Sequence, residues 1–499
     1  MTKDKSTAFF GHPIGLFTLF STEMWERFNY YGMRALLTIF LTGTLISGGF
    51  GLDQNAALAI YGIFTGMVYI TPLLGGILAD KILGQRKSIY IGALTMAIGQ
   101  CILAFSATLS PDAMEFKHTI FYIGLGVLVF GNGFFKPNIS TMVGDLYSPK
   151  DVRRDGAFTI FYMGINIGAT LGPLIAGALG EKIAWQYGFL AAAVAMLIGF
   201  TWFYFSHKAL GTTGMPPKYN RTKTKLTPRD SLDIALYVVS IIAAVTGFIF
   251  GWKILPEIIR TILLWTVAIV GVGYMGINIG KNTTGKTEWS RVSVILILAL
   301  ANIFFWSGFE QTGGTLSLFA RDNVNRMVGS FEIPVTWFQM INAIAIVLFA
   351  PLFSILWSKL DKIRLNPSTP LKFGWGMLLM SLGFVAMAFT NDLTHGGLVK
   401  VSPLWLVMVF LLHTWGELCL SPIGLSMVTK LSPAKLVSTM MGIWFGSIAL
   451  ANYLAASLKS IVEKFDLPLF WFIAGETFIA ALILMAISPI LKKQMKGIV

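Results

Sequence analysis

Residues 14–46 read IGLFTLFSTEMWERFNYYGMRALLTIFLTGTLI, an apolar stretch interrupted by only a few charged side chains. About 20 apolar residues in a helix cross the ~30 Å hydrocarbon core of a membrane, so this stretch is long enough to span one. Similar runs recur to the end of the chain. We therefore expect an all-α membrane protein with fourteen transmembrane helices, near 14–46, 57–79, 88–108, 119–143, 157–180, 185–206, 232–252, 258–280, 292–320, 334–358, 373–390, 402–429, 436–458 and 467–491.

The composition supports a membrane protein and excludes several other classes. Hydrophobic residues make up 55% of the 499 residues, and charged residues make up 12%. Soluble domains carry about 25% charged residues, so this chain has too little surface charge for a soluble enzyme or a disordered protein. The two cysteines, Cys101 and Cys419, lie far apart inside apolar runs, which excludes a disulfide scaffold. We expect both to be small buried hydrophobic residues.

The net charge of +14 reflects membrane topology. Most of the 38 Lys and Arg residues fall in the termini and loops on one side of the predicted helices, and three, Arg27, Arg34 and Lys136, lie within spans. The positive-inside rule places that side, with both termini, in the cytoplasm. Nucleic-acid binding would need the basic residues on a soluble face with stacking aromatic residues, so we expect no nucleic-acid partner.

The polar segment 207–231 is the predicted cytoplasmic linker between two bundles of six helices, 1–206 and 291–499. We expect 232–290 to form an inserted transmembrane hairpin. The halves share a weak repeat, because Gly131–Pro137 on the fourth helix and Gly416–Pro422 on its counterpart are both Gly-x5-Pro. Parallel repeats with helix-loosening residues at matched depth are typical of two-bundle secondary transporters.

One motif of soluble enzymes is present. Gly280–Thr287 fits the phosphate-binding pattern G-x-x-x-x-G-K-[ST], which requires a preceding strand and a following helix. A predicted membrane helix precedes it instead, so we interpret it as a chance match in a cytoplasmic turn and expect no nucleotide. No motif for metal binding or acyl transfer occurs, so we expect no catalytic residue, no metal and no cofactor.

Ionisable residues inside the spans are the informative ones. Each costs at least ~2.5–3.5 kcal/mol at a helix centre, so each is a candidate for function. The first helix carries six polar residues on an arc of about 140° at 100° per residue: Glu23, Glu26, Arg27, Tyr30, Tyr31 and Arg34. Residues four apart can pair on this face. The alternative interpretation is a buried structural ion pair.

Three further charged residues complete the set: Lys136, Glu310 and Glu417. We expect Glu310 and Arg34 at similar depth, and Lys136 and Glu417 across a central cavity. The acids number four (Glu23, Glu26, Glu310 and Glu417) and the bases three, so one acid lacks a partner and is a candidate for protonation. A cavity with cationic side chains in one place and an acidic side chain in another suits a zwitterionic ligand, which carries a carboxylate at one end and an amine at the other.

The polar stripe resembles a family signature. Residues 23–32, EMWERFNYYG, are similar to the E-x-x-E-R-F-x-Y-Y-G motif of proton-dependent oligopeptide transporters, prokaryotic branch, in the major facilitator superfamily. Residues 161–168, FYMGINIG, resemble the F-Y-x-x-I-N-x-G signature, and segments 133–137, 309–311 and 421–426 also match. Segments 76–80 and 84–87 resemble the superfamily's loop between helices 2 and 3. This resemblance implies the major facilitator fold, two six-helix bundles plus the inserted hairpin.

The resemblance also implies roles for individual residues. Arg34 and Lys136 would hold a peptide carboxylate and Glu417 the amino terminus, with Asn166 and Asn342 as hydrogen-bonding partners. The side-chain pockets and the rest of the substrate site would include Tyr30, Tyr31, Tyr69, Trp306, Glu310, Ser421 and Trp444. Proton coupling would involve Glu23, Glu26, Arg27 and Glu310, and gating would involve Asp80, Arg86 and Lys87.

The sequence therefore predicts a proton-coupled symporter that imports di- and tripeptides by alternating access. An alternative is a symporter of another small solute, such as nitrate or a peptide-like metabolite. Alternatives from a different functional class are a nucleotide-driven pump, a receptor or a channel. The expected partners are peptides, protons and the lipid bilayer. We expect a monomer in the inner membrane of a bacterium.

Overall fold

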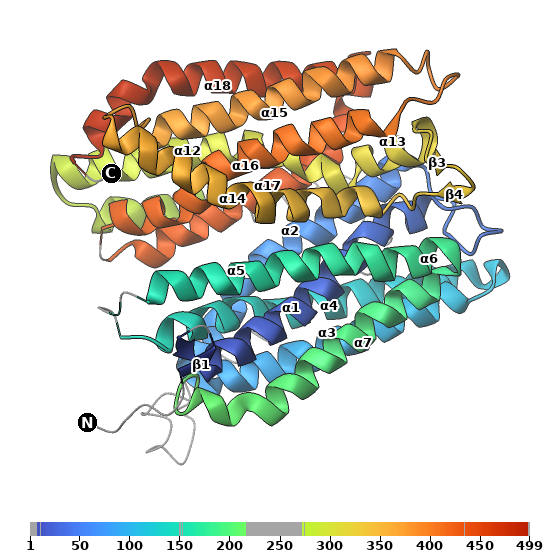
Figure 1. Cartoon of the computed structure of the whole chain (residues 1–499), viewed down its shortest axis with the longest axis horizontal. Helices are drawn as coiled ribbons and strands as arrows, with labels where there is room; N and C mark the ends of the chain where they lie inside the picture. The colour runs from blue at the N-terminus through green and yellow to red at the C-terminus, as the bar shows by residue number, and fades with distance from the viewer. Residues whose placement is uncertain are drawn as a thin grey trace. The chain divides into compact units, whose positions relative to one another are not determined.

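The computed structural model describes residues 7–9, 11–148, 151, 153–215, 272–273, 275–433 and 435–497. Eleven helical segments of this described part are long and apolar enough to cross a membrane. The helix α1 (Ile14–Thr42) is long enough as well, but it carries four charged side chains. The predicted helical membrane protein is confirmed, whereas the predicted spans 232–252 and most of 258–280 lie outside the described residues (Figure 1).

The first unit of the structure comprises residues 1–52 and 67–255. It begins with the short strands β1 (Thr7–Phe9) and β2 (His12–Pro13). Its described helices are α1, the second part of α2 (Gln54–Leu78) from residue 67 on, α3 (Gln85–Thr108), α4 (Met114–Asp145), α5 (Arg154–Leu171), α6 (Ala178–Lys182) and α7 (Trp185–Ser206). A π-helical turn, Gly172–Gly177, joins α5 to α6, so these two helices form one span.

The second unit comprises residues 53–66 and 256–499. Its described elements are the first part of α2, α12 (Gly285–Phe309), α13 (Thr315–Asn323), the hairpin of β3 (Met327–Val328) and β4 (Phe331–Glu332), α14 (Trp337–Lys362), α15 (Thr369–Asp392), α16 (Pro403–Leu431), α17 (Val437–Lys464) and α18 (Leu469–Gln494). The helix α2 is thus divided between the units. A side chain at Gly62 would collide with Ala456, which shows how closely this part of α2 packs on α17.

The two glycines of the predicted repeat both lie where helices approach closely. A Cβ atom on Gly131 of α4 would lie 2.8 Å from the carbonyl oxygen of Gly92 on α3. A Cβ atom on Gly416 of α16 would lie 2.6 Å from the carbonyl oxygen of Gly376 on α15. Small residues let backbones of membrane helices approach in this way. The repeat in the sequence therefore corresponds to a repeated helix contact, one in each unit.

The segment before α1 is tied to the loop after α4. The Nδ1 atom of His12 lies 2.8 Å from the hydroxyl of Tyr147, and Arg153 donates to the carbonyl of Gly11 at 3.2 Å. The side-chain and backbone hydrogen bonds that Arg153 donates lower the pKa of Asp151 to about 2. These contacts fix the start of α1, the helix that carries the predicted polar stripe.

One sequence-based expectation about local structure is wrong, and another is refined. The predicted span 292–320 lies within one candidate membrane span, Gly285–Asn323, but its helix is interrupted: α12 ends at Phe309, a short turn follows over Glu310–Gly313, and α13 starts at Thr315. Two consecutive glycines, Gly313 and Gly314, favour this break, since glycine is a poor helix former. Cys101 is exposed on α3, whereas Cys419 is buried as expected.

The phosphate-binding motif lies between two helices. Residues 275–282 are helical, and α12 begins at Gly285. No strand directly precedes the motif within the described residues, so the arrangement that cradles a phosphate does not form there.

Candidate functional site

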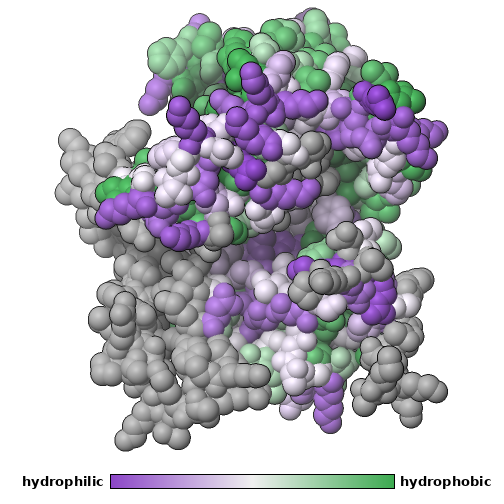
Figure 2. Space-filling model, turned by 90° about the vertical axis from the view of Figure 1, so that its left-hand side faces the viewer, coloured by the Kyte–Doolittle hydropathy of each residue, from purple (hydrophilic) through white to green (hydrophobic). Residues whose placement is uncertain are grey.

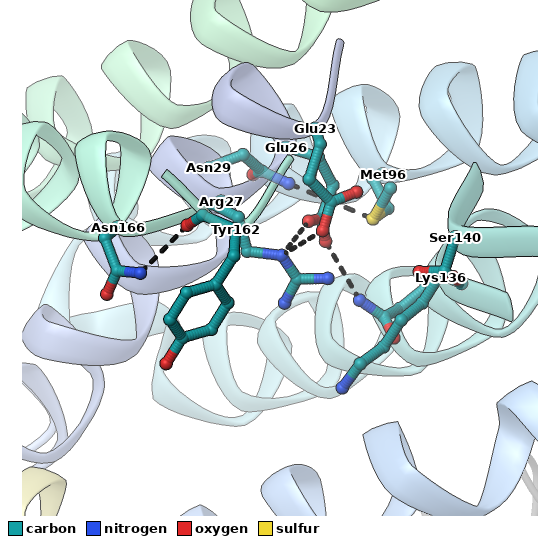
Figure 3. Close-up of polar contacts among 10 residues, drawn as sticks. Glu23, Glu26, Arg27, Asn29, Met96, Lys136, Ser140, Tyr162 and Asn166 are labelled. Carbon is teal, nitrogen blue, oxygen red and sulfur yellow. Dashed lines mark hydrogen bonds and ion pairs between the residues drawn. The ribbon is translucent and has the colours of Figure 1, made fainter. Parts of the chain in front are cut away.

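The polar stripe of α1 forms a compact buried ion cluster (Figure 3). The Nε atom of Arg27 lies 2.7 Å from Oε1 of Glu23 and 2.8 Å from Oε2 of Glu26. All three side chains are buried. The pair that the four-residue spacing predicts is therefore present, and Glu26 joins it. Two carboxylates share one guanidinium, which leaves an excess of one negative charge when both acids are ionised.

A neighbouring helix completes this cluster. Asn132 on α4 is buried and donates its amide N–H to Oε1 of Glu26 at 3.1 Å. Oε1 of Glu26 therefore accepts a hydrogen bond. Oε2 of Glu23 and Oε2 of Glu26 are both buried without a hydrogen-bond partner among the described residues, and Oε2 of Glu26 contacts Arg27 as an ion pair. Sequence analysis missed Asn132 as a site residue. A polar amide inside an apolar run, four residues before Lys136, was the available signal.

Lys136 projects from α4 close to the same cluster, as Figure 3 shows. Its Nζ atom lies 4.0 Å from the centre of the Tyr69 ring on α2. This is a short cation–π contact. The structure therefore brings the predicted site residues Tyr69 and Lys136 together within the first unit.

The remaining residues of the α1 stripe form an aromatic and cationic surface. The rings of Tyr30 and Tyr31 meet edge to face at 5.2 Å. The guanidinium of Arg34 lies 5.8 Å from the Tyr31 ring, and that of Arg27 lies 6.0 Å from the Tyr30 ring. Arg34 is buried, and the two tyrosines orient the arginines by stacking.

Asn166 on α5 is also buried, and its amide is partly engaged within its own helix. Its Nδ2 atom donates to the carbonyl of Tyr162 at 2.9 Å, which Figure 3 includes. The side-chain oxygen is then the group best placed to accept a bond from another molecule.

In the second unit, Glu417 of α16 lies in a network with two other polar side chains. Asn342 of α14 donates to Oε2 of Glu417 at 2.9 Å and to the hydroxyl of Thr414 at 3.0 Å. The hydroxyl of Thr414 donates in turn to the carbonyl of Phe410 at 2.7 Å. Because both neighbours of the Asn342 amide accept hydrogen bonds, its nitrogen must face them and its oxygen must face away.

Thr414 was not predicted as a site residue. It lies three residues before Glu417 and is fully buried, so it shares one helix face with the glutamate. The sequence shows this spacing, but only the contact with Asn342, 72 positions away, reveals what the hydroxyl does.

Glu310 lies at the break between α12 and α13 and is buried. The break is stabilised by the next residue, because Gln311 donates to the carbonyl of Ala455 on α17 at 2.9 Å and accepts from Thr315 at 2.6 Å. Discontinuous helices of this kind place irregular backbone and charged groups near the binding sites of secondary transporters.

The other predicted residues of the second unit take part in packing. Trp306 meets the ring of Phe309 edge to face at 5.0 Å and is half-buried. Trp444 is buried against Phe373 at 6.2 Å, and the Ser421 hydroxyl is buried without a hydrogen-bond partner among the described residues. Their roles in substrate binding stay predictions.

The predicted gating residues have different surroundings. Arg86, in the first turn of α3, donates to the carbonyls of Thr213 and Gly211, both at 2.7 Å. Its backbone N–H also donates to the carbonyl of Gly214 at 3.0 Å. Asp80 and Lys87 are exposed. Arg86 therefore ties α3 to the segment that follows α7, where the predicted linker begins.

The charge count made from the sequence was incomplete. Lys117 and Lys372 were assigned to loops, but both lie within helices and are buried, because α4 begins at Met114 and α15 at Thr369, earlier than predicted. Lys117 donates to the carbonyls of Gly48 and Gly49 at 2.8 and 3.3 Å. Glu476 on α18, inside a predicted span, was also overlooked. The excess of one acid therefore holds only for the subset counted.

Some predictions concern residues from both units. Lys136 and Arg34 belong to the first unit, and Glu417 and Glu310 to the second. Their predicted relations across a cavity and in depth stay predictions. The described residues contain no group of three or more His, Cys, Asp or Glu side chains that could hold a metal ion.

Comparisons with known proteins agree with this arrangement. The profile of the POT family matches residues 86–475. The peptide transporter YePEPT of Yersinia enterocolitica is 39% identical over 492 residues, covering 97% of this chain and 94% of its own. A di-/tripeptide transporter of Lactococcus lactis subsp. cremoris is 34% identical over 497 residues, covering 97% of each chain.

Solved structures give the same result. A crystal structure of a peptide transporter POT in complex with sulfate superposes with a TM-score of 0.84 at 36% identity, covering 98% of this chain and 97% of that one. A mutant of a peptide transporter POT in complex with alafosfalin also gives 0.84 at 36% identity, with the same coverage. Sequence and structure therefore agree along nearly the whole chain, and the protein belongs to the POT family.

Proposed function

We propose that this protein is a proton-coupled symporter that imports di- and tripeptides by alternating access. The relatives named above are peptide and di-/tripeptide transporters, and family membership supports proton coupling. One observation carries the proposal beyond resemblance. The first unit holds two cationic side chains, Arg34 and the half-buried Lys136, over tyrosine rings, and the second holds a glutamate whose carboxylate accepts a hydrogen bond from an asparagine.

These two kinds of site match the two ends of a peptide. Arg34 and Lys136 are chemically suited to a carboxylate, because each carries a positive charge beside a tyrosine ring. Glu417 and the oxygen of Asn342 are suited to a primary ammonium, which donates three hydrogen bonds. A simple anion such as nitrate would have no use for the glutamate.

The coupling proton has two candidate locations. Glu310 is buried at a helix break, and its ionised form would attract Arg34 in one state of the cycle; protonation would free the guanidinium for the peptide carboxylate. Proton and peptide then stabilise the same state, which is the requirement for coupling. The ion cluster on α1 is the second candidate location, because Oε2 of Glu23 and Oε2 of Glu26 are both buried without a hydrogen-bond partner among the described residues and the two carboxylates share Arg27.

The first experiment measures uptake of labelled dialanine into proteoliposomes. We expect accumulation when a pH gradient, acidic outside, is imposed without nucleotide. Unlabelled dialanine should compete, and nitrate at the same concentration should not. Uptake that requires ATP would refute the symporter proposal, and competition by nitrate would favour the alternative solute.

A second experiment places the coupling proton. Glu310→Gln imitates the protonated acid, so it should abolish uphill accumulation and preserve downhill exchange of labelled for unlabelled peptide. Asp322→Asn, an exposed acid on α13, is the matched control and should retain both activities. Retained gradient-driven accumulation in Glu310→Gln would move the coupling site to Glu23 or Glu26. Loss of both binding and exchange would show that Glu310 is a structural or substrate contact.

We further propose that the protein works as a monomer in a bacterial inner membrane with both termini in the cytoplasm. The distribution of Lys and Arg supports the orientation. Accessibility of cysteines introduced near each terminus to an impermeant reagent tests it in intact cells.

A further inference from the structure

A buried lysine at the start of α15 has no role in the proposed transport cycle. Lys372 is 8% exposed, and its Nζ atom lies 4.6 Å from the centre of the Trp357 ring on α14. Among the described residues, no hydrogen-bond acceptor and no carboxylate binds it within the distances of a hydrogen bond or an ion pair. An ammonium group has three donors, and an aromatic ring is not a conventional hydrogen-bond acceptor for them. Another molecule can therefore supply an acceptor to this ammonium.

The beginning of α15 also favours a negative charge. Its N-cap residue, Ser368, makes no side-chain capping bond, and its hydroxyl instead lies 3.0 Å from that of Ser488 on α18. Pro370, the second residue of this 24-residue helix, has no N–H, so the backbone N–H groups of Thr369 and Leu371 are the ones left without a side-chain cap. A helix N-terminus with free N–H groups attracts anions, and side chains in the first turn tilt toward it. Lys372 lies in this region of the helix.

The connection between α14 and α15 is basic as well. Lys359 and Lys362 lie in the last turn of α14, and Arg364 follows in the connection. The nearby acid is Asp361, whose Oδ1 atom accepts a hydrogen bond from Asn366 at 3.2 Å. Positive charges therefore outnumber negative ones at this end of the two helices. Figure 2 shows that hydrophilic side chains gather on the face of the molecule where these helices end.

Exposed apolar side chains flank these charges. Ile363 is 61% exposed and Leu365 is 67% exposed, both within the basic connection. Leu356 on α14 and Trp375 on α15 are exposed too, one turn or less from the pair formed by Trp357 and Lys372. A free inorganic anion would gain nothing from such apolar surface, whereas the acyl chains of a lipid would cover it.

We propose that the junction of α14 and α15 is a binding site for the phosphate of an anionic phospholipid. Lys372, held over Trp357, contacts the phosphate together with the start of α15. Lys359 and Arg364 add charge at the membrane surface, and the acyl chains lie along the exposed apolar residues of the two helices. This site is independent of the transport function proposed above.

The test uses the full-length protein in detergent and native mass spectrometry with added phosphatidylglycerol or phosphatidylcholine of the same acyl chains. The wild-type protein should bind phosphatidylglycerol at least about tenfold more tightly than phosphatidylcholine. Lys372→Met keeps a long apolar stem and removes the charge, so it should abolish this preference. Lys493→Met, an exposed cation in the last turn of α18, is the matched control and should retain it.

Two further measurements make each outcome decisive. Inorganic phosphate at millimolar concentration should compete poorly; strong competition together with no preference between the lipids would show a site for a free anion and overturn the lipid assignment. Ile363→Ser with Leu365→Ser keeps Lys372 and should weaken phosphatidylglycerol binding several-fold. An unchanged lipid preference in Lys372→Met would refute the proposal. If that variant fails to fold, an unchanged preference in the double serine variant refutes it instead.

Discussion

Replacing Glu417 by glutamine should weaken the binding of peptides with a free amino terminus. In the structure, one oxygen of Glu417 accepts from Asn342 at 2.9 Å, and glutamine can keep that bond through its own carbonyl oxygen. The substitution therefore preserves the packing of α14 on α16 and removes only the negative charge. A hydrogen bond to a charged group contributes roughly 1.5–3 kcal/mol, and each 1.4 kcal/mol is a factor of ten in affinity. We expect a loss of about 10- to 100-fold.

The assay compares dialanine with its N-acetylated form in binding to the purified protein. The acetylated peptide has no ammonium group, so its weaker binding should change less than about threefold in Glu417→Gln. The thermal midpoint without peptide serves as the control for folding. An equal loss for the two peptides would show that Glu417 is structural, and no loss for either would place the amino terminus elsewhere.

Three other substitutions test the remaining parts of the site. Lys136→Ala should weaken peptides with a free carboxyl terminus by about tenfold or more and affect their amides much less, since the carboxylate loses a charged partner; similar losses for acid and amide would contradict this role. Thr414→Val should free the Asn342 amide to rotate and weaken the binding of free-amine peptides by about three- to tenfold. Thr414→Ser keeps the hydroxyl and should bind these peptides like the wild type. Equal affinities of the two variants would show that Thr414 is not part of the site. Arg86→Gln should lower the thermal midpoint and slow transport, because it breaks two part-buried hydrogen bonds to the segment after α7, while peptide affinity in detergent stays within a few-fold. A larger loss of affinity would argue against a conformational role.

Local features of the sequence predict most of the helical framework. Span positions follow from the length of each apolar run, and the bounds of α7 agree with the predicted 185–206. The ion pair of Glu23 and Arg27 follows from a spacing of four residues on one helix. Errors occur at helix starts, where polar residues such as Lys117 and Lys372 already belong to a helix that hydropathy predicts to begin later.

The sequence by itself therefore determined the membrane class, the placement of the described spans and the charged stripe of α1, because these depend on composition and on periodicity within single helices. Only the tertiary structure decided which partners the charges have. Asn132 reaches Glu26 across 106 positions, and Asn342 joins Thr414 and Glu417 across more than 70, through contacts between helices that no local pattern encodes. The tertiary structure also shows where the helix of the predicted span is interrupted, at Glu310, where the side chain of the next residue, Gln311, donates to the carbonyl of Ala455 on α17.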